Sequence, residues 1–407
     1  MFLTFFCRVF QFFLNLGDYV LPWRKSIRIE GAGCIREIPR LIRENQGTKP
    51  LLVTDPGLVK AGIAARVTGV LENTGVSYSI FSEVEANPSI NTVNKIHDFF
   101  RSEGCDSFIA LGGGSSMDAA KAAAARIARP RMTVNQMEGL FKILKKIPLF
   151  IAVPTTAGTG SETTVAALIT DTETHHKYTI IDLSLIPWYA VLDPELTTGL
   201  PPAITATTGM DALTHAVESY LCWTCRTKET MEFSLEAVKA IFECLPKVYK
   251  NGADLEARQI MLTASYKAGA AFTRTAVGNI HAIAHTLGGL YNTPHGLANA
   301  VILPIVLEDY GKKVWKKLAR LAEASGITLK PSATDKEKAE AFINAIFNMN
   351  AAMGIPRYLD FIKSEDIPQI TKWAFRESNP VYPVPVVYDL TRFGKVVEIL
   401  RTGSESK

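Results

Sequence analysis

The sequence lacks the features that mark membrane-spanning, nucleic-acid-binding or disulfide-stabilised proteins. No apolar run reaches the roughly 20 residues that a helix needs to cross a bilayer. The 44 Lys and Arg residues nearly balance the 40 Asp and Glu residues, so a formal charge of only +4 indicates neither nucleic acid nor a membrane as a partner. Six cysteines scattered over 407 residues do not form a disulfide framework. We therefore expect a soluble, cytoplasmic protein and, because none of these partners is indicated, an enzyme.

The hydrophobic content of 47% excludes disorder, and the length favours two domains. Short apolar runs alternate with helical patterns before residue 200, which predicts an α/β domain with a mostly parallel sheet. The expected strands are 49–54, 77–81, 107–111 and 149–153, and the expected helices are 91–103 and 119–128. Helical patterns dominate from Pro201 onward. We therefore predict an α/β domain over 23–198 and an all-α domain over 199–407, preceded by a separate segment, 1–22.

The segment 1–22 is unusually rich in phenylalanine and has no basic start or small-residue cleavage site. Its polar residues recur at helical spacing and leave an apolar side opposite them, which predicts an amphipathic helix. The polar positions are Thr4, Arg8, Gln11, Asn15 and Asp18, and the apolar ones are Phe2, Phe5, Phe6, Val9, Phe13 and Leu16. Burial of apolar side chains favours docking on the protein or on a second subunit over membrane binding, because a single Arg is weak support for a lipid-binding helix.

Two loops of small residues follow two of the predicted strands. The first is the triplet Gly112–Gly114, which stands between a strand and a helix, where glycine lets the backbone approach a phosphate at a helix N-terminus. The spacing is not G-x-G-x-x-G, and a tight turn is the alternative. The second is the segment 154–162 (PTTAGTGSE), after the next strand. Two such loops on adjacent strands predict a crevice that binds a nucleotide.

The histidines indicate a metal site in the second half of the chain. Asp211 and His215 are four residues apart, and so are His281 and His285, so each pair lies on one face of a helix. His295 follows in a turn-like segment. A buried histidine usually has no metal, but two such pairs and a third element would be costly to bury without one. Carboxylate and imidazole ligands suit iron, zinc or nickel.

Four segments together resemble the iron-containing (group III) alcohol dehydrogenases. They are 112–121 (GGGSSMDAAK), 154–162, 209–220 (GMDALTHAVESY) and 278–300 (GNIHAIAHTLGGLYNTPHGLANA). The resemblance extends over 24–400 and implies the dehydroquinate synthase-like architecture, with a Rossmann-like dinucleotide-binding domain, a helical metal domain and a site in the cleft between them. It also implies NAD and Fe²⁺ as cofactors, with Zn²⁺ as an alternative metal, and a homodimer.

The resemblance assigns roles to individual residues of this sequence. It places the metal ligands at Asp211, His215, His281 and His295, and gives His285 a role in proton transfer or orientation. The implied cofactor contacts are Asp55, Asn87, Gly113, Gly114, Ser115, Asp118, Thr155, Thr156, Thr159 and Lys177. In this family a carboxylate at the position of Asp55 contacts the adenosine ribose and would repel a 2′-phosphate, so NAD is favoured over NADP.

The implied reaction is hydride transfer between a small primary alcohol, or its aldehyde, and NAD(H), with the metal polarising the substrate oxygen. Arg274 stands where many members carry Asn, and it could pair with a substrate carboxylate, which would make the enzyme a semialdehyde reductase. A salt bridge or a cofactor contact is the alternative for Arg274. A lyase of the dehydroquinate-synthase type would need more basic residues, and a metallohydrolase would leave both small-residue loops without a role. A non-catalytic metal or nucleotide sensor also remains open.

Overall fold

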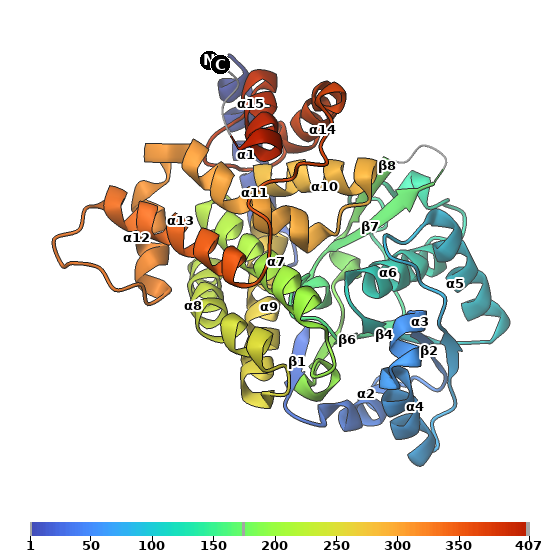
Figure 1. Ribbon diagram of the computed structural model, residues 1–407. Coiled ribbons are helices and arrows are strands. Elements are labelled where there is room, and N and C mark those ends of the chain that lie inside the picture. The colour runs from blue at the N-terminus through green and yellow to red at the C-terminus, as the bar shows by residue number, and fades with distance from the viewer. Residues whose placement is uncertain (1, 173–175, 404–407) are drawn as a thin grey trace. The chain divides into compact units, whose positions relative to one another are not determined.

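The computed structural model describes residues 2–172 and 176–403, which form two compact units. The α/β unit comprises Pro22–Leu200 and Gly252–Gly269. The helical unit comprises the chain up to Leu21, Pro201–Asn251 and the chain from Ala270 onward. Helix α9 (Leu255–Thr275) runs through the boundary, so its first part belongs to the α/β unit and its last residues belong to the helical unit. Figure 1 shows the predicted succession of an α/β part and a helical part along the chain.

A six-stranded sheet in the order β1-β9-β6-β4-β2-β3 forms the centre of the α/β unit, and every pair in it is parallel. Its strands are β1 (Ile27–Glu30), β2 (Pro50–Val53), β3 (Ser79–Phe81), β4 (Ser107–Gly112), β6 (Leu149–Pro154) and β9 (Tyr189–Leu192). The central strands β2 and β4 are buried along their whole length, as expected for strands covered on both faces. The predicted parallel sheet is confirmed.

A second, three-stranded sheet was not predicted from the sequence. It has the order β5-β8-β7, and β7 and β8 pair antiparallel. Its strands are β5 (Gly139–Leu140), β7 (Ala166–Asp171) and β8 (His176–Ile181). Burial along β7 alternates only partly, so the period-2 signal of a half-exposed strand was weak.

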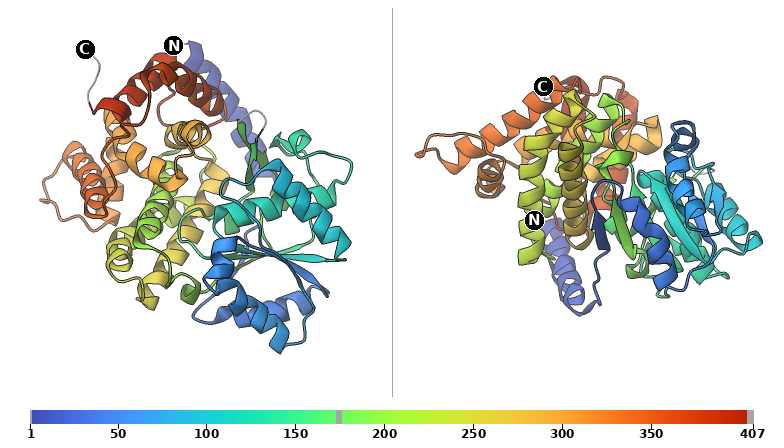
Figure 2. Two further views of the ribbon diagram at one scale, coloured as in Figure 1. Left: turned by 45° about the vertical axis from the view of Figure 1, so that its right-hand side comes forward. Right: turned by 90° about the horizontal axis from the view of Figure 1, so that it is seen from below.

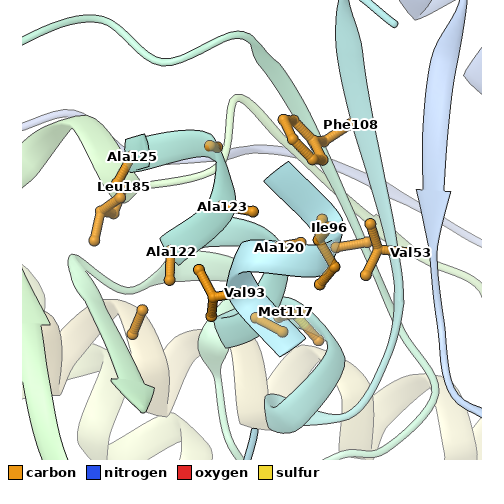
Figure 3. Packing of buried hydrophobic residues seen from close by; sticks show 14 of the residues in the cluster. Val53, Val93, Ile96, Phe108, Met117, Ala120, Ala122, Ala123, Ala125 and Leu185 are labelled. Carbon is orange, nitrogen blue, oxygen red and sulfur yellow. The ribbon is translucent and has the colours of Figure 1, made fainter. Parts of the chain in front are cut away.

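Helices cover both faces of the six-stranded sheet because its side chains alternate between two apolar clusters. Leu51 and Val53 of β2 contact the cluster under α5 and α6, whereas Leu52 contacts the cluster under α2 and α4. The helices of this unit are α2 (Ile38–Glu44), α3 (Pro56–Lys60), α4 (Ile63–Asn73), α5 (Ile90–Ser102) and α6 (Gly114–Ala128). Figure 3 shows the alanine-rich face of α6 packed beside Val93 and Ile96 of α5. Small side chains on α6 let it approach the sheet closely.

The helical unit contains most of the helices after residue 200, which run from green to red in Figure 2. They are α7 (Pro202–Leu221), α8 (Lys228–Lys250), α10 (Asn279–Tyr291), α11 (His295–Tyr310), α12 (Trp315–Ala324), α13 (Asp335–Ala352), α14 (Ile367–Ser378) and α15 (Leu390–Thr402). Their starts follow known signals: α7 has proline at its first positions, and Thr227 and Thr334 form capping boxes for α8 and α13. In the described part of the chain, we find no helix that is both long and apolar enough to span a membrane.

The amphipathic helix α1 (Phe2–Val20) forms as predicted, but its orientation on the protein is the reverse of the expected one. Its buried residues are Cys7, Gln11 and Asp18, which lie on or beside the polar side. The phenylalanines are exposed instead; Phe2 is 83% exposed and Phe5 is 68% exposed. The expectation that the apolar side docks on the chain's own surface is therefore wrong, because hydrogen bonds from the polar side fix the helix the other way round.

Candidate functional site

Four predicted ligands meet inside the helical unit. Asp211 and His215 come from α7, His281 from α10 and His295 from the first residue of α11. One potential ligand atom of each residue lies within 4.8 Å of the others, and all but His295 are buried. The imidazole of His215 stacks on His281, with 4.6 Å between ring centroids, and on Phe272 on its other side at 4.1 Å. Residues from three helices therefore converge on one point.

The side chains around this point fit a cation. The amide nitrogen of the fully buried Asn299 lies 2.7 Å from Oδ1 of Asp211, 3.0 Å from Nε2 of His281 and 3.1 Å from Nε2 of His295. Three acceptor atoms thus direct their lone pairs at a common position. The two N–H groups of the Asn299 amide can satisfy only some of these acceptors. One carboxylate and three imidazoles are suitable ligands for a divalent transition metal.

A buried carboxylate holds His281 in the form that binds a metal. Glu218 accepts hydrogen bonds from the backbone N–H groups of Gly278 at 2.8 Å and Ile280 at 2.9 Å, and it lies 2.6 Å from Nδ1 of His281. Burial raises the pKa of Glu218 to about 8, and burial lowers the pKa of His281 well below its usual value. When Glu218 is ionised, a neutral His281 donates to it from Nδ1 and keeps the lone pair of Nε2 for the cluster.

His285 lies beside the four predicted ligands. Its ring stacks on that of His295 with 5.1 Å between centroids. Nδ1 of His285 lies 2.5 Å from Oε1 of Glu377, and the same oxygen accepts a hydrogen bond of 2.9 Å from the hydroxyl of Tyr382. These three side chains form a hydrogen-bonded chain in which a proton could move toward or away from His285.

Arg274 forms a salt bridge with helix α1. Its guanidinium donates to Oδ2 of Asp18 on α1 at 2.6 Å, and only 22% of its side chain is exposed. The salt bridge, which the sequence offered as one alternative, is therefore confirmed. It removes the observation that favoured a carboxylate-bearing substrate.

The small-residue loops of the α/β unit come together at one edge of the sheet. Strands β2, β4 and β6 are parallel neighbours, and Gly112 at the end of β4 pairs with Pro154 at the end of β6. The chain after β2 leads into α4 on one face of the sheet, whereas the chain after β4 leads into α6 on the other. The connections after β2 and β4 therefore leave the sheet on opposite faces. Such a point is a topological switch point, and α/β sheets bind nucleotides there.

Both loops depend on glycine and on close contact. Gly112 has a φ of +149°, and a Cβ there would lie 2.6 Å from Oγ of Ser116. A Cβ on Gly114, the first residue of α6, would lie 3.1 Å from Cγ2 of Thr159 in the second loop. The hydroxyl of Thr156 is buried and has no hydrogen-bond partner among the described residues. A phosphate at the N-terminus of α6 would give that hydroxyl a partner, so these residues fit a dinucleotide.

The other predicted cofactor residues lie at three places in the α/β unit. Asp55 ends the loop after β2 and caps α3, accepting a hydrogen bond of 3.0 Å from the N–H of Leu58. Lys177 on β8 donates to Oδ1 of Asn87 at 2.9 Å, so these two lie together. Asp118 accepts from Oγ of Ser161 and from the N–H of Leu168, which ties α6 to its neighbours. Its role as a cofactor contact stays a prediction.

Glu218, Asn299 and Glu377 are site residues that the sequence reasoning missed. Two of them carried a signal. Glu218 stands three residues after His215 and seven after Asp211, and Asn299 stands four residues after His295, so each shares a helix face with a ligand. Glu377 had no local signal, because it reaches His285 from a helix 92 residues away along the chain.

Comparisons with known proteins agree on a single family. Residues 26–194 match the family described as "Iron-containing alcohol dehydrogenase", and residues 205–401 match "Fe-containing alcohol dehydrogenase family, C-terminal". The chain is 36% identical over 371 residues to the NAD-dependent methanol dehydrogenase of Bacillus methanolicus, covering 90% of this chain and 96% of the relative. It is 36% identical over 369 residues to the 1,3-propanediol dehydrogenase of Klebsiella pneumoniae, covering 90% and 94%. The solved structure of an alcohol dehydrogenase from Oenococcus oeni superposes with a TM-score of 0.89 at 31% identity, covering 94% of this chain and all of that one.

Proposed function

The chain belongs to the iron-containing alcohol dehydrogenase family, and from this premise we propose that it transfers a hydride between a small, uncharged primary alcohol, or its aldehyde, and NAD(H). The observation that carries the proposal is the convergence of Asp211, His215, His281 and His295 within 4.8 Å, on a chain that also presents two small-residue loops at the switch point of a parallel sheet. A substrate without a carboxylate is favoured because Arg274 is already paired with Asp18.

In this proposal Asp211, His215, His281 and His295 hold a divalent iron ion, or zinc as the alternative. When bound, such an ion supplies Lewis acidity that polarises a carbonyl or hydroxyl oxygen. Glu218 orients His281 through Nδ1, and the neutral ring would leave Nε2 for the ion. The amide of Asn299 contacts three of these ligand atoms in the structure, and an ion that took their lone pairs would replace it.

The proton that accompanies hydride transfer needs a carrier near the substrate oxygen. His285 is placed for this task because it lies beside His295 and hydrogen-bonds to Glu377 through Nδ1. Nε2 of His285 is then available for a proton from the alcohol, and Glu377 stabilises the charged ring that results. Tyr382 orients the carboxylate of Glu377 in turn.

On the α/β unit, the N-terminus of α6 would hold the pyrophosphate of NAD. Gly113, Gly114 and Ser115 provide backbone N–H groups at the positive end of the helix dipole. The hydroxyls of Thr156 and Thr159 lie beside Gly113 and Gly114, and the N–H of Thr155 bonds to the carbonyl of Gly112. We assign Thr155 to the same site, and Lys177 with Asn87 forms a further polar pair. Hydride transfer itself is the chemistry of the nicotinamide.

The direct test follows the absorbance of reduced nicotinamide during oxidation of ethanol, propanol or 1,3-propanediol with NAD. Metal-stripped protein is compared with protein reloaded anaerobically with Fe²⁺ or with Zn²⁺. We expect turnover only after reloading, because the four ligands need the ion to act on the substrate oxygen. Turnover by the stripped protein would contradict the metal-dependent mechanism, and silence of the reloaded protein with every alcohol would contradict the substrate class.

Asp55 is expected to set the preference for NAD. Asp55→Ser removes the carboxylate but keeps an N-cap for α3, which loses at most a small part of its stability. Because a 2′-phosphate is no longer repelled, kcat/KM for NADP should rise relative to that for NAD by at least roughly tenfold, or about 1.4 kcal/mol. Steady-state kinetics with both cofactors measure the ratio, and Asp55→Glu is the matched control that keeps the charge. An unchanged ratio in the serine variant would remove Asp55 from this role.

We also propose that the protein works in the cytoplasm as a homodimer. All six cysteines are free thiols in the structure, in keeping with a reducing compartment. The exposed apolar side chains of α1 also support self-association.

A further inference from the structure

Helix α1 turns a continuous aromatic surface away from the protein. At 100° per residue its exposed side chains occupy one half of the helix circumference, with Val9 at the middle. We call this surface the apolar face of α1; it consists of Phe2, Phe5, Phe6, Val9, Phe10, Phe12, Phe13, Leu16, Tyr19 and Val20, all of them exposed. The only charged residues of the helix, Arg8 and Asp18, lie on the opposite side.

The orientation of α1 is fixed by its polar side. Arg8 donates to the carbonyls of Val384 and Pro385 at 2.8 and 3.1 Å. Gln11 donates to the carbonyls of Pro380 and Tyr382 at 3.0 and 2.7 Å.

Three further contacts hold the same side of the helix. The side chain of Gln11 accepts a hydrogen bond from Trp223, Asn15 accepts one from the N–H of Cys225, and Asp18 pairs with Arg274. Rolling α1 over to bury its phenylalanines would leave all of these groups without their partners, at a cost of about 1–3 kcal/mol for each buried one. The apolar face therefore stays outward in the folded chain.

The exposed apolar area is too large for an isolated protein in water. A fully exposed aromatic side chain offers roughly 200 Å². With the exposed fractions of the side chains on the apolar face, the exposed apolar area is on the order of 1,000 Å². The largest apolar patch on a typical monomer is only about 300–600 Å². A stable complex of standard size buries roughly 800 Å² on each partner. One helix thus offers enough surface for a whole interface.

We propose that the apolar face of α1 binds the same face of a second copy of this chain. A two-fold axis pairs identical surfaces, and this face can meet itself without bringing like charges together because it carries none. The area matches what each partner of a stable dimer buries. A lipid surface is the weaker alternative, since interfacial helices gain from Lys and Arg beside the bilayer, and Arg8 is committed to two backbone carbonyls. The inference does not depend on the reaction that the protein catalyses.

The first test replaces three exposed side chains at the centre of the face, Phe5→Gln, Val9→Gln and Phe13→Gln, in the full-length chain. Glutamine is a good helix former, and all three residues are exposed, so α1 should stay folded. Light scattering after size-exclusion chromatography should give the wild type an even multiple of the chain's mass and the variant half that value, with at least a roughly 100-fold weaker self-association. The control replaces three exposed residues elsewhere, Val59→Gln, Leu144→Gln and Ile204→Gln, and should keep the wild-type mass.

The second test does not depend on the triple variant. Val9 is 40% exposed and Val59 on α3 is 44% exposed, so Val9→Cys and Val59→Cys place equally accessible thiols on and off the face. Near a two-fold axis a residue lies close to its own copy. Mild oxidation should therefore cross-link the Val9→Cys protein into covalent dimers well above the level of the Val59→Cys protein and the wild type.

Three results would overturn the proposal. The first is an unchanged mass of the triple variant, and the second is equal cross-linking of the two single-cysteine variants. The third is a wild type of single-chain mass that sediments with phosphatidylcholine vesicles while the triple variant does not, which would assign the face to lipid.

Discussion

Replacing His281 by alanine is expected to abolish turnover while leaving NAD binding almost unchanged. His281 is the most enclosed of the four ligands, and its Nε2 lies within 3.9 Å of Oδ1 of Asp211. Without it the site keeps three ligands and loses the ring that Glu218 orients. Loss of several kcal/mol of charge stabilisation corresponds to at least roughly a thousandfold in kcat. Metal content by mass spectrometry and kcat by reduced-nicotinamide absorbance measure the two effects.

Two further variants separate a metal effect from general damage. Glu218→Gln keeps a hydrogen-bonding side chain near His281, and we expect roughly 10- to 100-fold weaker metal binding rather than complete loss. His97→Ala removes another buried imidazole, on α5, which lies in the α/β unit. It should retain the metal. Equal metal content in the His281→Ala protein and the wild type, with normal turnover, would refute the ligand assignment.

Replacing Gly114 by valine is expected to block NAD binding with little effect on the metal. Even a Cβ at this position comes within 3.1 Å of Cγ2 of Thr159, and the two methyl groups of valine would fill the space between the two loops. They would also cover the N–H groups at the start of α6, where a phosphate needs direct access. We expect the KM for NAD to rise by at least about 100-fold, the equivalent of losing roughly 2.7 kcal/mol of binding.

The matched control for Gly114→Val is Gly69→Val on α4. Gly69 also lies in a helix of the α/β unit, but a Cβ there meets nothing within 4 Å. Both variants carry the same β-branched side chain, so their difference reports on the loop contact alone. Isothermal titration with NAD and metal analysis of both proteins complete the comparison. Normal NAD affinity in the Gly114→Val protein would show that the dinucleotide does not approach the start of α6.

The sequence predicted the candidate site where local spacing determines geometry. Helical i, i+4 spacing placed Asp211 with His215, and it placed His281 with His285. Parallel strands brought the loops after β4 and β6 to one edge, because crossover connections leave the carboxyl ends of parallel strands together. The partners of these residues were not predictable in the same way. Glu377 reaches His285 through tertiary packing, which cannot be predicted from the spacing of residues along the sequence.

The reversed orientation of α1 shows a limit of amphipathic patterns. The pattern correctly separates a polar side from an apolar one, but it does not say which side meets the protein. Here the receiving surface presents backbone carbonyls of Pro380, Tyr382 and Val384. Polar side chains are the only groups that can satisfy such acceptors, so they are the ones buried. Strands β7 and β8 of the smaller sheet show a similar limit. They were not predicted because they are defined by their pairing with each other and not by a clear periodicity of their own.

The contacts of α1 have a practical consequence for anyone who prepares this protein. The family match begins at residue 26, so an expression plasmid designed by homology would omit α1 yet retain all four ligands and both glycine-containing loops. Such a truncated product would expose the carbonyls that Arg8 and Gln11 cover and would lack the carboxylate that pairs with Arg274. The disturbed stretch after Glu377 is the one that positions the partner of His285. An affinity tag is therefore better fused to the C-terminus, because trimming to the boundary of the family match would remove a helix that supports the surroundings of His285, the proposed proton carrier.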